Sequence, residues 1–194
     1  MYTHYNGRFE RDVTILHPGE YLATGEDIII STVLGSCIAV ALHDASTGIG
    51  GLNHFMLPGE LHSRQFFAEE NGRYGMYAME LLINELMKKG ARRDTLTAKV
   101  FGGAHVLSGG TGNIPDSNIT FAMEFLETER IPVVSSDVGG TEARKVLFFA
   151  ATARVLLKRF GGQKVAPVQR EERAYLSRIS SQKRSQKDSD VTLF

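Results

Sequence analysis

The sequence predicts a chain that mixes β-strands with α-helices, as in an α/β protein. A β-branched run at residues 27–30 is typical of a buried strand, and residues 38–43 alternate between larger and smaller side chains, which indicates a second strand. A helical spacing instead relates Tyr74, Ala78, Leu81, Leu82 and Leu86. Both periods therefore occur in one chain, but periodicity by itself does not select one architecture.

A hairpin is predicted after the second strand. Residues 44–48 read Asp-Ala-Ser-Thr-Gly, which has the length and composition of a hairpin loop, and residues 49–57 are expected to return as the partner strand. If His43 and Ile49 close the loop, directly opposed residues lie about 4.5–5.5 Å apart at Cβ. The start of the strand at residues 38–43 therefore lies beside the end of its partner strand at residues 49–57.

This hairpin brings Cys37 close to His54. In that register Cys37 lies opposite Phe55 and beside His54, although strict alternation points the thiol and the imidazole to opposite faces of the sheet. A bulge, or a position of Cys37 on the turn before the strand, removes this conflict. A second interpretation makes Ser36 the cap of a short helix with Cys37 in its first turn, where the helix dipole favours a thiolate.

The remaining segments continue the mixture of strands and helices. The first helix is expected to end at Lys88-Lys89-Gly90, where two cations and a glycine suit a helix C-terminus. Residues 1–16 are polar with scattered aromatics and are predicted to form a loosely held lead-in. Further predicted elements are a strand over residues 95–101, a helix over 117–129, and strands over 131–135, 144–149 and 154–159.

A change of composition after residue 162 divides the chain. Residues 1–162 are long enough to bury a core and are predicted to form a single catalytic domain. Residues 163–194 are rich in Lys, Arg, Ser and Gln, so they are expected to be a polar tail that is partly helical or disordered. Disorder is predicted from Ser180 onward, after one short helix face made by Val168, Tyr175, Leu176 and Ile179.

The overall composition excludes several classes of partner. Lys plus Arg and Asp plus Glu both number 22 among 194 residues, which argues against nucleic acid or an anionic membrane surface. No apolar run approaches the roughly 20 residues that span a bilayer, so no membrane insertion is expected. The amino-terminal residues contain no signal-peptide core, and a single cysteine suits a reducing compartment. We therefore expect a cytoplasmic protein.

The single cysteine, Cys37, is the first candidate for chemistry. A lone thiol acts as a nucleophile, a redox sensor or a metal ligand, or else it is simply a small buried apolar group. Gly35 and Ser36 precede it and allow a close approach of the backbone. With His54 as the base, the neighbouring imidazolium lowers the pKa of the thiol. The hydroxyls of Ser31 and Thr32, or a backbone carbonyl, are candidates to orient that imidazole.

Two rival uses of these side chains are less well supported. His43, His54, His62 and His105 are available as ligands, but none forms a recognised ligand pair on one helix face, so no metal and no cofactor are expected. A redox sensor is disfavoured because the chain has no second cysteine to resolve an oxidised thiol. Glycine pairs at 102–103, 109–110 and 139–140 lack the spacing of phosphate-binding loops and indicate tight turns.

Four motifs together resemble the bacterial chemoreceptor glutamine deamidases of the CheD family. Residues 34–40 read Leu-Gly-Ser-Cys-Ile-Ala-Val, and residues 50–58 read Gly-Gly-Leu-Asn-His-Phe-Met-Leu-Pro. Residues 99–104 read Lys-Val-Phe-Gly-Gly-Ala, and residues 137–140 read Asp-Val-Gly-Gly before Arg-Lys-Val at 144–146. The motifs occur in the order of that family over residues 18–160, so the resemblance is more specific than any one of them.

The resemblance implies an activity and partners. The family hydrolyses glutamine side-chain amides on the cytoplasmic helices of chemoreceptors, which makes it a protein-glutamine glutaminase. It is also associated with hydrolysis of receptor glutamyl methyl esters and with binding of a CheC-type phosphatase. The implied fold is α/β (α+β), with layered β-sheets flanked by helices, similar to cytotoxic-necrotizing-factor deamidases. A rival hypothesis is a non-catalytic regulatory binding module for the CheC-type phosphatase.

The resemblance also assigns site residues. Cys37 and His54 fall on the nucleophile and the base, and the third member lies six residues before the cysteine, which is Ser31 here; Thr32 is the substitute candidate. Expected substrate-binding residues are Gly35, Ser36, Phe101 and Gly102. The chain departs from the family pattern at residues 114–118, Ile-Pro-Asp-Ser-Asn, and at Ala143, where a glycine is usual.

Overall fold

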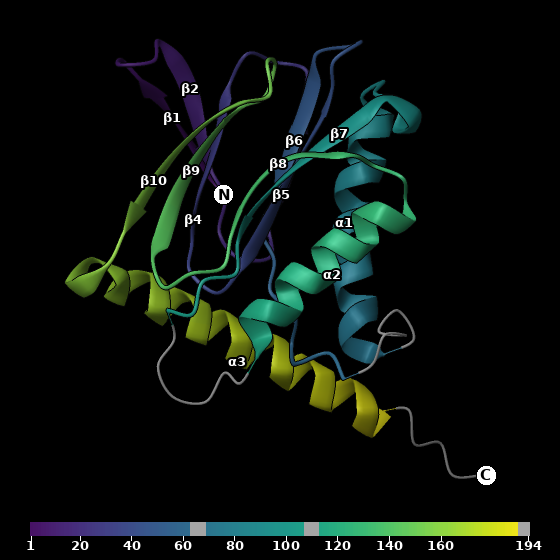
Figure 1. Cartoon of the computed structure of the whole chain (residues 1–194), viewed down its shortest axis with the longest axis vertical. Coiled ribbons are helices and arrows are strands. Elements are labelled where there is room, and N and C mark those ends of the chain that lie inside the picture. The colour runs from purple at the N-terminus through teal and green to yellow at the C-terminus, as the bar shows by residue number, and fades with distance from the viewer. Residues whose placement is uncertain (63–68, 107–112, 190–194) are drawn as a thin grey trace.

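The computed structural model describes residues 1–62, 69–106 and 113–189, with the side chains of the last helix described up to residue 182. The described residues form two five-stranded sheets that pack face to face, with two helices on the outer face of one sheet and a third helix across one end of the pair (Figure 1). This is the mixed α/β (α+β) class, and its layered sheets flanked by helices are the arrangement that the family resemblance implies.

The first sheet has the strand order β1-β2-β4-β9-β10 and the second has the order β3-β6-β5-β7-β8. Neighbouring strands are antiparallel except for β2 with β4 and β7 with β8, which are parallel. The strands of the first sheet are β1 (Tyr2–Asn6), β2 (Arg11–Ile15), β4 (Ile29–Leu34), β9 (Ala143–Phe149) and β10 (Arg154–Phe160). Those of the second are β3 (Tyr21–Thr24), β5 (Ile38–Asp44), β6 (Ile49–Asn53), β7 (Leu96–Gly102) and β8 (Val133–Val138).

Three α-helices accompany the sheets. Helix α1 (Glu70–Lys88) packs on β3 and β6, and α2 (Ile114–Thr128) packs on β5 and β7. Helix α3 (Ala166–Ser189) follows a short 3-10 helix, η3 (Gly162–Val165), and runs beneath both sheets (Figure 1). A further 3-10 helix, η2 (Arg93–Thr95), leads into β7. The expected helix end is confirmed, because Gly90 follows α1 in the left-handed region with φ of 106°.

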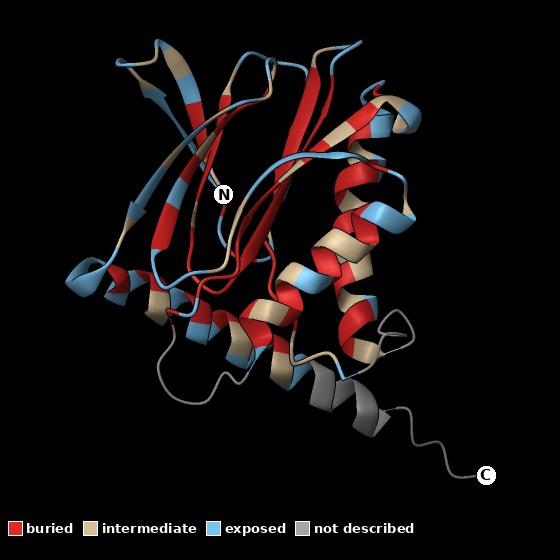
Figure 2. Cartoon of the chain, viewed as in Figure 1, coloured by how far each residue is buried: buried red, intermediate tan, exposed pale blue. Residues whose placement is uncertain are grey.

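Two apolar cores meet at β5, whose side chains alternate between them. Ile38, Val40 and Leu42 face α1 and α2, whereas Cys37, Ala39 and Ala41 face the first sheet. Figure 2 shows the buried residues gathered in the strands of both sheets and on the inner sides of the helices. The predicted alternation of larger and smaller side chains in this strand is therefore confirmed: the larger ones fill the helix side and the smaller ones fill the space between the sheets.

The predicted lead-in at residues 1–16 is wrong. These residues form the antiparallel pair β1 and β2, which adds two strands to the edge of the first sheet. Most of β1 is exposed, so it is held by backbone hydrogen bonds and carries no apolar periodicity for a sequence pattern to detect. The short strand β3 was also missed.

The tail is more ordered than its composition indicates. Helix α3 continues to Ser189, past Ser180, where disorder was predicted. Its buried side chains include the predicted Val168, Tyr175 and Ile179, while Leu176 is half-buried. Glu172 is buried in the same stripe, with only 1% of its surface exposed. A carboxylate placed in an apolar stripe needs hydrogen-bond partners, and these lie at the β4–β5 loop.

Candidate active site

The β5–β6 hairpin places Cys37 and His54 on the same side of the second sheet. Asp44 pairs with Ile49, and Ile38 pairs with Phe55, which is one residue away from the register expected from sequence. The expected opposition of Cys37 and Phe55 is therefore wrong. Because a one-residue shift reverses the faces, His54 now shares the face of Ala39 and Cys37, and the predicted conflict disappears.

Residues 35–37 form the short connection from β4 in the first sheet to β5 in the second. They form a bend, so Cys37 precedes the strand as one sequence interpretation required, and the alternative of a short helix capped by Ser36 is wrong. The N–H of Ala104 donates to Gly35 O and the N–H of Gly103 donates to Cys37 O, both at 2.7 Å. The loop is thus anchored to the end of β7.

The three consecutive backbone N–H groups of this loop converge on one anion, the carboxylate of Glu172. The N–H groups of Gly35 and Cys37 donate to Oε1 at 2.9 and 3.0 Å. The N–H and the hydroxyl of Ser36 donate to Oε2 at 2.9 and 2.6 Å. Successive N–H groups aimed at one point form a backbone nest, a recurrent anion-binding arrangement. Gly35 and Ser36, expected at the substrate-binding site, therefore belong to an anion-binding loop.

His54 is oriented by Thr32, a residue of β4. The Thr32 hydroxyl donates to Leu16 O at 2.9 Å and lies 2.7 Å from Nδ1 of His54. Because the single hydroxyl proton is given to the carbonyl, the oxygen accepts from Nδ1–H, and the other ring nitrogen, Nε2, is left unprotonated. Nε2 has no hydrogen-bond partner among the described residues. This tautomer leaves Nε2 free to accept a proton.

Ser31, the other candidate for this role, lies on the opposite face of β4. It pairs with Leu147, which belongs to the outer cluster with Val13 and Ile29. Since successive side chains in a strand point to opposite faces, the Ser31 side chain faces away from His54. Ser31 serves the site through its backbone, because its carbonyl accepts the N–H of Leu16 at 2.9 Å.

The thiol and the imidazole are both buried and uncharged in this arrangement. Burial and the Glu172 carboxylate raise the pKa of the Cys37 thiol well above its ordinary value. Burial lowers the pKa of His54 to about 3. The prediction of a lowered thiol pKa is wrong for this structure, because the sulfur is buried and an anion rather than an imidazolium lies beside it.

Phe101 and Gly102 lie behind the loop of residues 35–37. Gly102 has a φ of 116°, and a Cβ on it would lie 2.1 Å from Cys37 O, so only glycine allows β7 to approach this closely. Phe101 is buried in the core between the sheets, in the same cluster as Cys37. In this structure the two residues support the loop that carries Cys37.

Two residues of the site escaped the sequence interpretation of chemistry. Asn118 donates to Ser36 O at 2.9 Å and accepts the N–H of Leu57 at 2.8 Å, so it connects α2 to the loop of residues 35–37. Glu172 was missed although it stands four residues after Val168 and three before Tyr175. A charged residue inside a predicted apolar stripe is the signal that marks a buried carboxylate.

A cation is one conceivable occupant of this cluster. Side-chain donor atoms of Cys37, His54 and Glu172 lie within 4.8 Å of one another. Each oxygen of Glu172, however, already accepts two hydrogen bonds. A cation would have to replace these bonds to reach the carboxylate, so the donor set is better suited to holding an anion.

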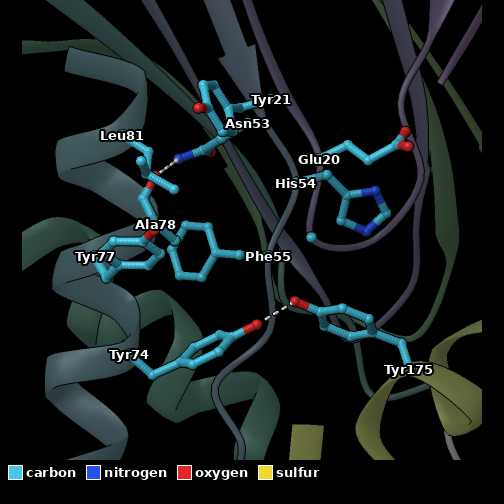
Figure 3. A pocket seen from close by; sticks show the side chains of 11 residues that line it. Glu20, Tyr21, Asn53, His54, Phe55, Tyr74, Tyr77, Ala78, Leu81 and Tyr175 are labelled. Carbon is cyan, nitrogen blue, oxygen red and sulfur yellow. Dashed lines mark hydrogen bonds between the residues drawn. The ribbon is translucent and has the colours of Figure 1, made fainter. Parts of the chain in front are cut away.

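A cavity of about 100 Å³ opens beside His54, between α1 and residues 19–21 (Figure 3). The hydroxyls of Tyr74, from α1, and Tyr175, from α3, point toward each other and hydrogen-bond at one side of it. Tyr77 on α1 and Glu20 on the β2–β3 connection also line the cavity. His54 is one of the residues that line this cavity, and α3 supplies part of its wall through Tyr175.

A thiol, an imidazole held in one tautomer by a hydroxyl, and a backbone nest are groups that cysteine-dependent hydrolases use. The family model described as CheD chemotactic sensory transduction matches residues 56–159. The chain belongs to the CheD family.

Several curated relatives carry the name probable chemoreceptor glutamine deamidase CheD. One from Albidiferax ferrireducens, numbered CheD 1, is 50% identical over 85% of this chain and 69% of its own length. One from Janthinobacterium sp. is 42% identical over 98% of this chain and 93% of its own length. One from Methylobacillus flagellatus is 43% identical over 93% of this chain and 90% of its own length. Among the helices in the described part of the chain, none has the length and apolar character needed to cross a bilayer.

Proposed function

We propose that this protein hydrolyses the side-chain amide of glutamines on the cytoplasmic helices of chemoreceptors, giving glutamate and ammonia. Membership of the CheD family and the names of its relatives support this substrate class. The observation that carries the proposal is the convergence of three backbone N–H groups on a carboxylate beside Cys37 and His54. A site that holds a glutamate carboxylate in this way holds the product of the proposed reaction.

The reaction begins once a glutamine side chain takes the place of Glu172. Nε2 of His54 accepts the thiol proton, and the sulfur attacks the carboxamide carbon. The oxyanion that forms is stabilised by the N–H groups of residues 35–37, each worth about 3–4 kcal/mol in such sites. His54 then protonates the departing ammonia and a thioester remains. Water activated by His54 hydrolyses the thioester to glutamate and restores the thiol.

Thr32 acts in this scheme as a positioning residue. Its hydroxyl holds the His54 tautomer in which Nε2 accepts protons. We assign the catalytic unit to residues 1–162 and treat residues 163–194 as an addition to it. The proposed substrate places the protein in the cytoplasm.

The first experiment measures ammonia release from a receptor cytoplasmic fragment, with mass spectrometry to locate the converted glutamines. Cys37→Ala is expected to reduce turnover to background, because the sulfur that forms the thioester is absent. His43→Ala is a matched control for His54→Ala, since the His43 side chain is also buried on this hairpin and, in the described part of the chain, bonds Ala151 O at 3.2 Å rather than a residue of the site. Turnover that persists in Cys37→Ala contradicts the mechanism.

A second candidate function is that of a regulatory binding module for a CheC-type phosphatase. One observation favours it: the thiol is fully buried and its anion nest is filled. Under this alternative, Cys37→Ala binds the phosphatase as tightly as the unchanged chain does, and neither releases ammonia from receptor fragments. Release of ammonia by the unchanged chain would support the deamidase and contradict a purely regulatory module.

A further inference from the structure

Helix α3 presents a glutamate to the nest in the way that a deamidated substrate helix would. The buried side chains Val168, Glu172, Tyr175 and Ile179 lie at positions i, i+4, i+7 and i+11, which is one face of a helix. Glu172 projects from the middle of this face and reaches the N–H groups of residues 35–37. The carboxylate is therefore held by a helix, beside a thiol that is proposed to produce carboxylates on helices.

We propose that α3 is a built-in product mimic: it covers the surface on which the substrate helix docks, and Glu172 takes the place of the glutamate formed there. This inference rests on the proposed function. The surface fits a partner of stated chemistry, an amphipathic helix with a glutamine at the position of Glu172. Such a helix carries apolar residues four positions before the glutamine and three and seven positions after it.

The covered surface is shaped for this helix. A Cβ on Gly35 would lie 2.4 Å from Val106 Cγ2 and 2.8 Å from Glu172 Oε2. A Cβ on Gly19, whose φ is 91°, would lie 2.9 Å from the Tyr175 ring. Two glycines thus leave the space that the side chains of α3 fill.

Polar contacts on either side of Glu172 hold the helix at the edges of this surface. Gln169 donates to Val106 O, and Tyr175 bonds to Tyr74 at the cavity beside His54 (Figure 3). His17 forms an exposed contact of 2.6 Å with Glu171. These contacts lie along or beside the face of α3 that carries Glu172, and a second helix of the same pattern could replace that face.

A packing role alone does not explain Glu172. Taking a carboxylate out of water is costly unless it is hydrogen-bonded, and an apolar side chain would fill the same stripe without that cost. Glu172 is retained with four donors, which satisfy both oxygens. A carboxamide satisfies fewer of them, because its NH₂ group would face an N–H donor. The closed site therefore holds product-like glutamate more tightly than substrate-like glutamine.

This difference gives a direct test in the full chain. In Glu172→Gln, the carboxamide is delivered to Cys37 by the chain itself. The sulfur adds to the amide carbon, His54 passes the thiol proton to the departing ammonia, and water hydrolyses the thioester to restore Glu172. Peptide mass spectrometry is expected to show that the introduced glutamine is converted to glutamate. The conversion must disappear in the Cys37→Ala, Glu172→Gln double variant.

Glu171→Gln provides the matched control. It places a glutamine one residue away on the same helix and removes the same charge, but Glu171 is exposed and contacts only His17 among the interactions described above. The glutamine introduced at this neighbouring position is therefore expected to remain unconverted even with Cys37 present. Equal conversion at both positions would indicate nonspecific chemistry and overturn the proposal.

A second measurement does not depend on turnover. Cys37 is fully buried beneath α3, so alkylation by iodoacetamide requires the helix to leave. At fixed pH, Glu172→Ala is expected to raise the alkylation rate by about tenfold or more, since charge-assisted hydrogen bonds that seat the helix are lost. Ile179→Asp, which disturbs the same face and keeps Glu172, is expected to raise it as well. Glu171→Gln is expected to raise the alkylation rate much less, because its contact with His17 is exposed and such pairs contribute little.

The outcomes separate this inference from the proposed function. If the unchanged chain converts receptor glutamines while the glutamine of Glu172→Gln stays intact and alkylation does not accelerate, the product-mimic proposal is wrong and the activity stands. If alkylation accelerates in Glu172→Ala but ammonia is released neither by Glu172→Gln nor from a receptor fragment, α3 covers the thiol without mimicking a product. In that case both the product-mimic proposal and the deamidase activity are wrong.

Discussion

Ser31 and Thr32 are neighbours in β4, yet only one of their hydroxyls reaches the imidazole. The distance of each residue from Cys37 along the sequence does not decide between them, whereas the alternation of the strand does. Thr32 faces the space between the sheets and bonds both Leu16 O and His54 Nδ1. Its β-branched side chain also restricts the rotamer, so the hydroxyl is held in one direction.

At this scale we predict that Thr32→Val impairs both activity and stability. The substitution keeps the shape of the side chain but leaves Nδ1–H of His54 and Leu16 O without their partner, which costs about 1–3 kcal/mol for buried groups. Turnover is expected to fall by up to about a hundredfold as the imidazole loses its orientation. Urea unfolding and steady-state ammonia release measure the two effects.

Thr32→Ser and Ser31→Ala are the controls for this prediction. Thr32→Ser keeps the hydroxyl and is expected to recover most of the activity. Ser31→Ala changes a buried hydroxyl on the other face of the strand and should leave turnover close to that of the unchanged chain. A larger loss of turnover in Ser31→Ala than in Thr32→Val would show that Ser31 orients the base.

At the scale of the element, the β5–β6 hairpin decides whether the thiol and the imidazole meet. Asp44 sets its register from the loop end: Oδ1 accepts the N–H and hydroxyl of Ser46, and Oδ2 accepts the N–H of Arg92. Burial by itself raises the pKa of Asp44, but these hydrogen bonds outweigh it and hold the pKa below its usual value. The ionised carboxylate therefore stabilises the hairpin.

We predict that Asp44→Asn is less stable than the unchanged chain by about 1–3 kcal/mol at neutral pH, because an amide cannot accept all three bonds. The folded-state pKa lies below the unfolded value, so the contribution of Asp44 is complete above the ordinary value of 3.8 and is lost as pH falls below it. The difference in the free energy of unfolding between Asp44→Asn and the unchanged chain, measured in urea, should therefore become smaller in acid.

Asp94→Asn is the matched control for the hairpin prediction. Asp94 forms an exposed ion pair with Arg92 at 2.7 Å, and such pairs contribute little. The control is expected to change stability by less than about 1 kcal/mol at neutral pH. If Asp44→Asn were no less stable than the control at any pH, the carboxylate would not set this hairpin.

At the scale of the whole molecule, Arg144 joins the two sheets next to the site. It lies on β9 of the first sheet, and its guanidinium donates to Gly102 O at the end of β7 and to Gly139 O after β8. It also lies 3.1 Å from Asp137 with 2% of its side chain exposed. Gly102 in turn packs against the backbone of Cys37, so this arginine anchors the strand behind the nucleophile.

We predict that Arg144→Met destabilises the chain by about 3–5 kcal/mol, the usual cost of removing one partner of a buried ion pair. The buried Gly102 carbonyl and the half-buried Gly139 carbonyl lose this donor, and Asp137 loses the buried one of its two arginines. Arg159→Met removes the other arginine of Asp137, which is exposed and bonds it at 2.7 Å, and should cost less than about 1 kcal/mol. Thermal and urea unfolding distinguish them, and equal effects would contradict the role assigned to Arg144.

Much of the local structure was predictable because it depends on neighbours in the sequence. The apolar spacing of α1 and the alternation of β5 follow from short-range periods, and the structure confirms them. The hairpin is confirmed as well, but Asp44 belongs to β5, so its loop covers residues 45–48 and not 44–48. Edge strand β1 was missed because its exposed side chains carry no apolar pattern. The helix of the tail was predicted, but its extent to Ser189 was not.

The sequence by itself determined the mixed class, the single thiol with its nearby imidazole, and the family motifs that point to amide hydrolysis. The tertiary structure decided the register that puts Cys37 and His54 on one face, the choice of Thr32 over Ser31, and the approach of Glu172 to residues 35–37. Those three features depend on contacts between residues that are far apart in the sequence, by up to 137 positions for Gly35 and Glu172. A local period cannot resolve a one-residue shift in pairing, nor can it say which distant helix carries a charge into an anion nest.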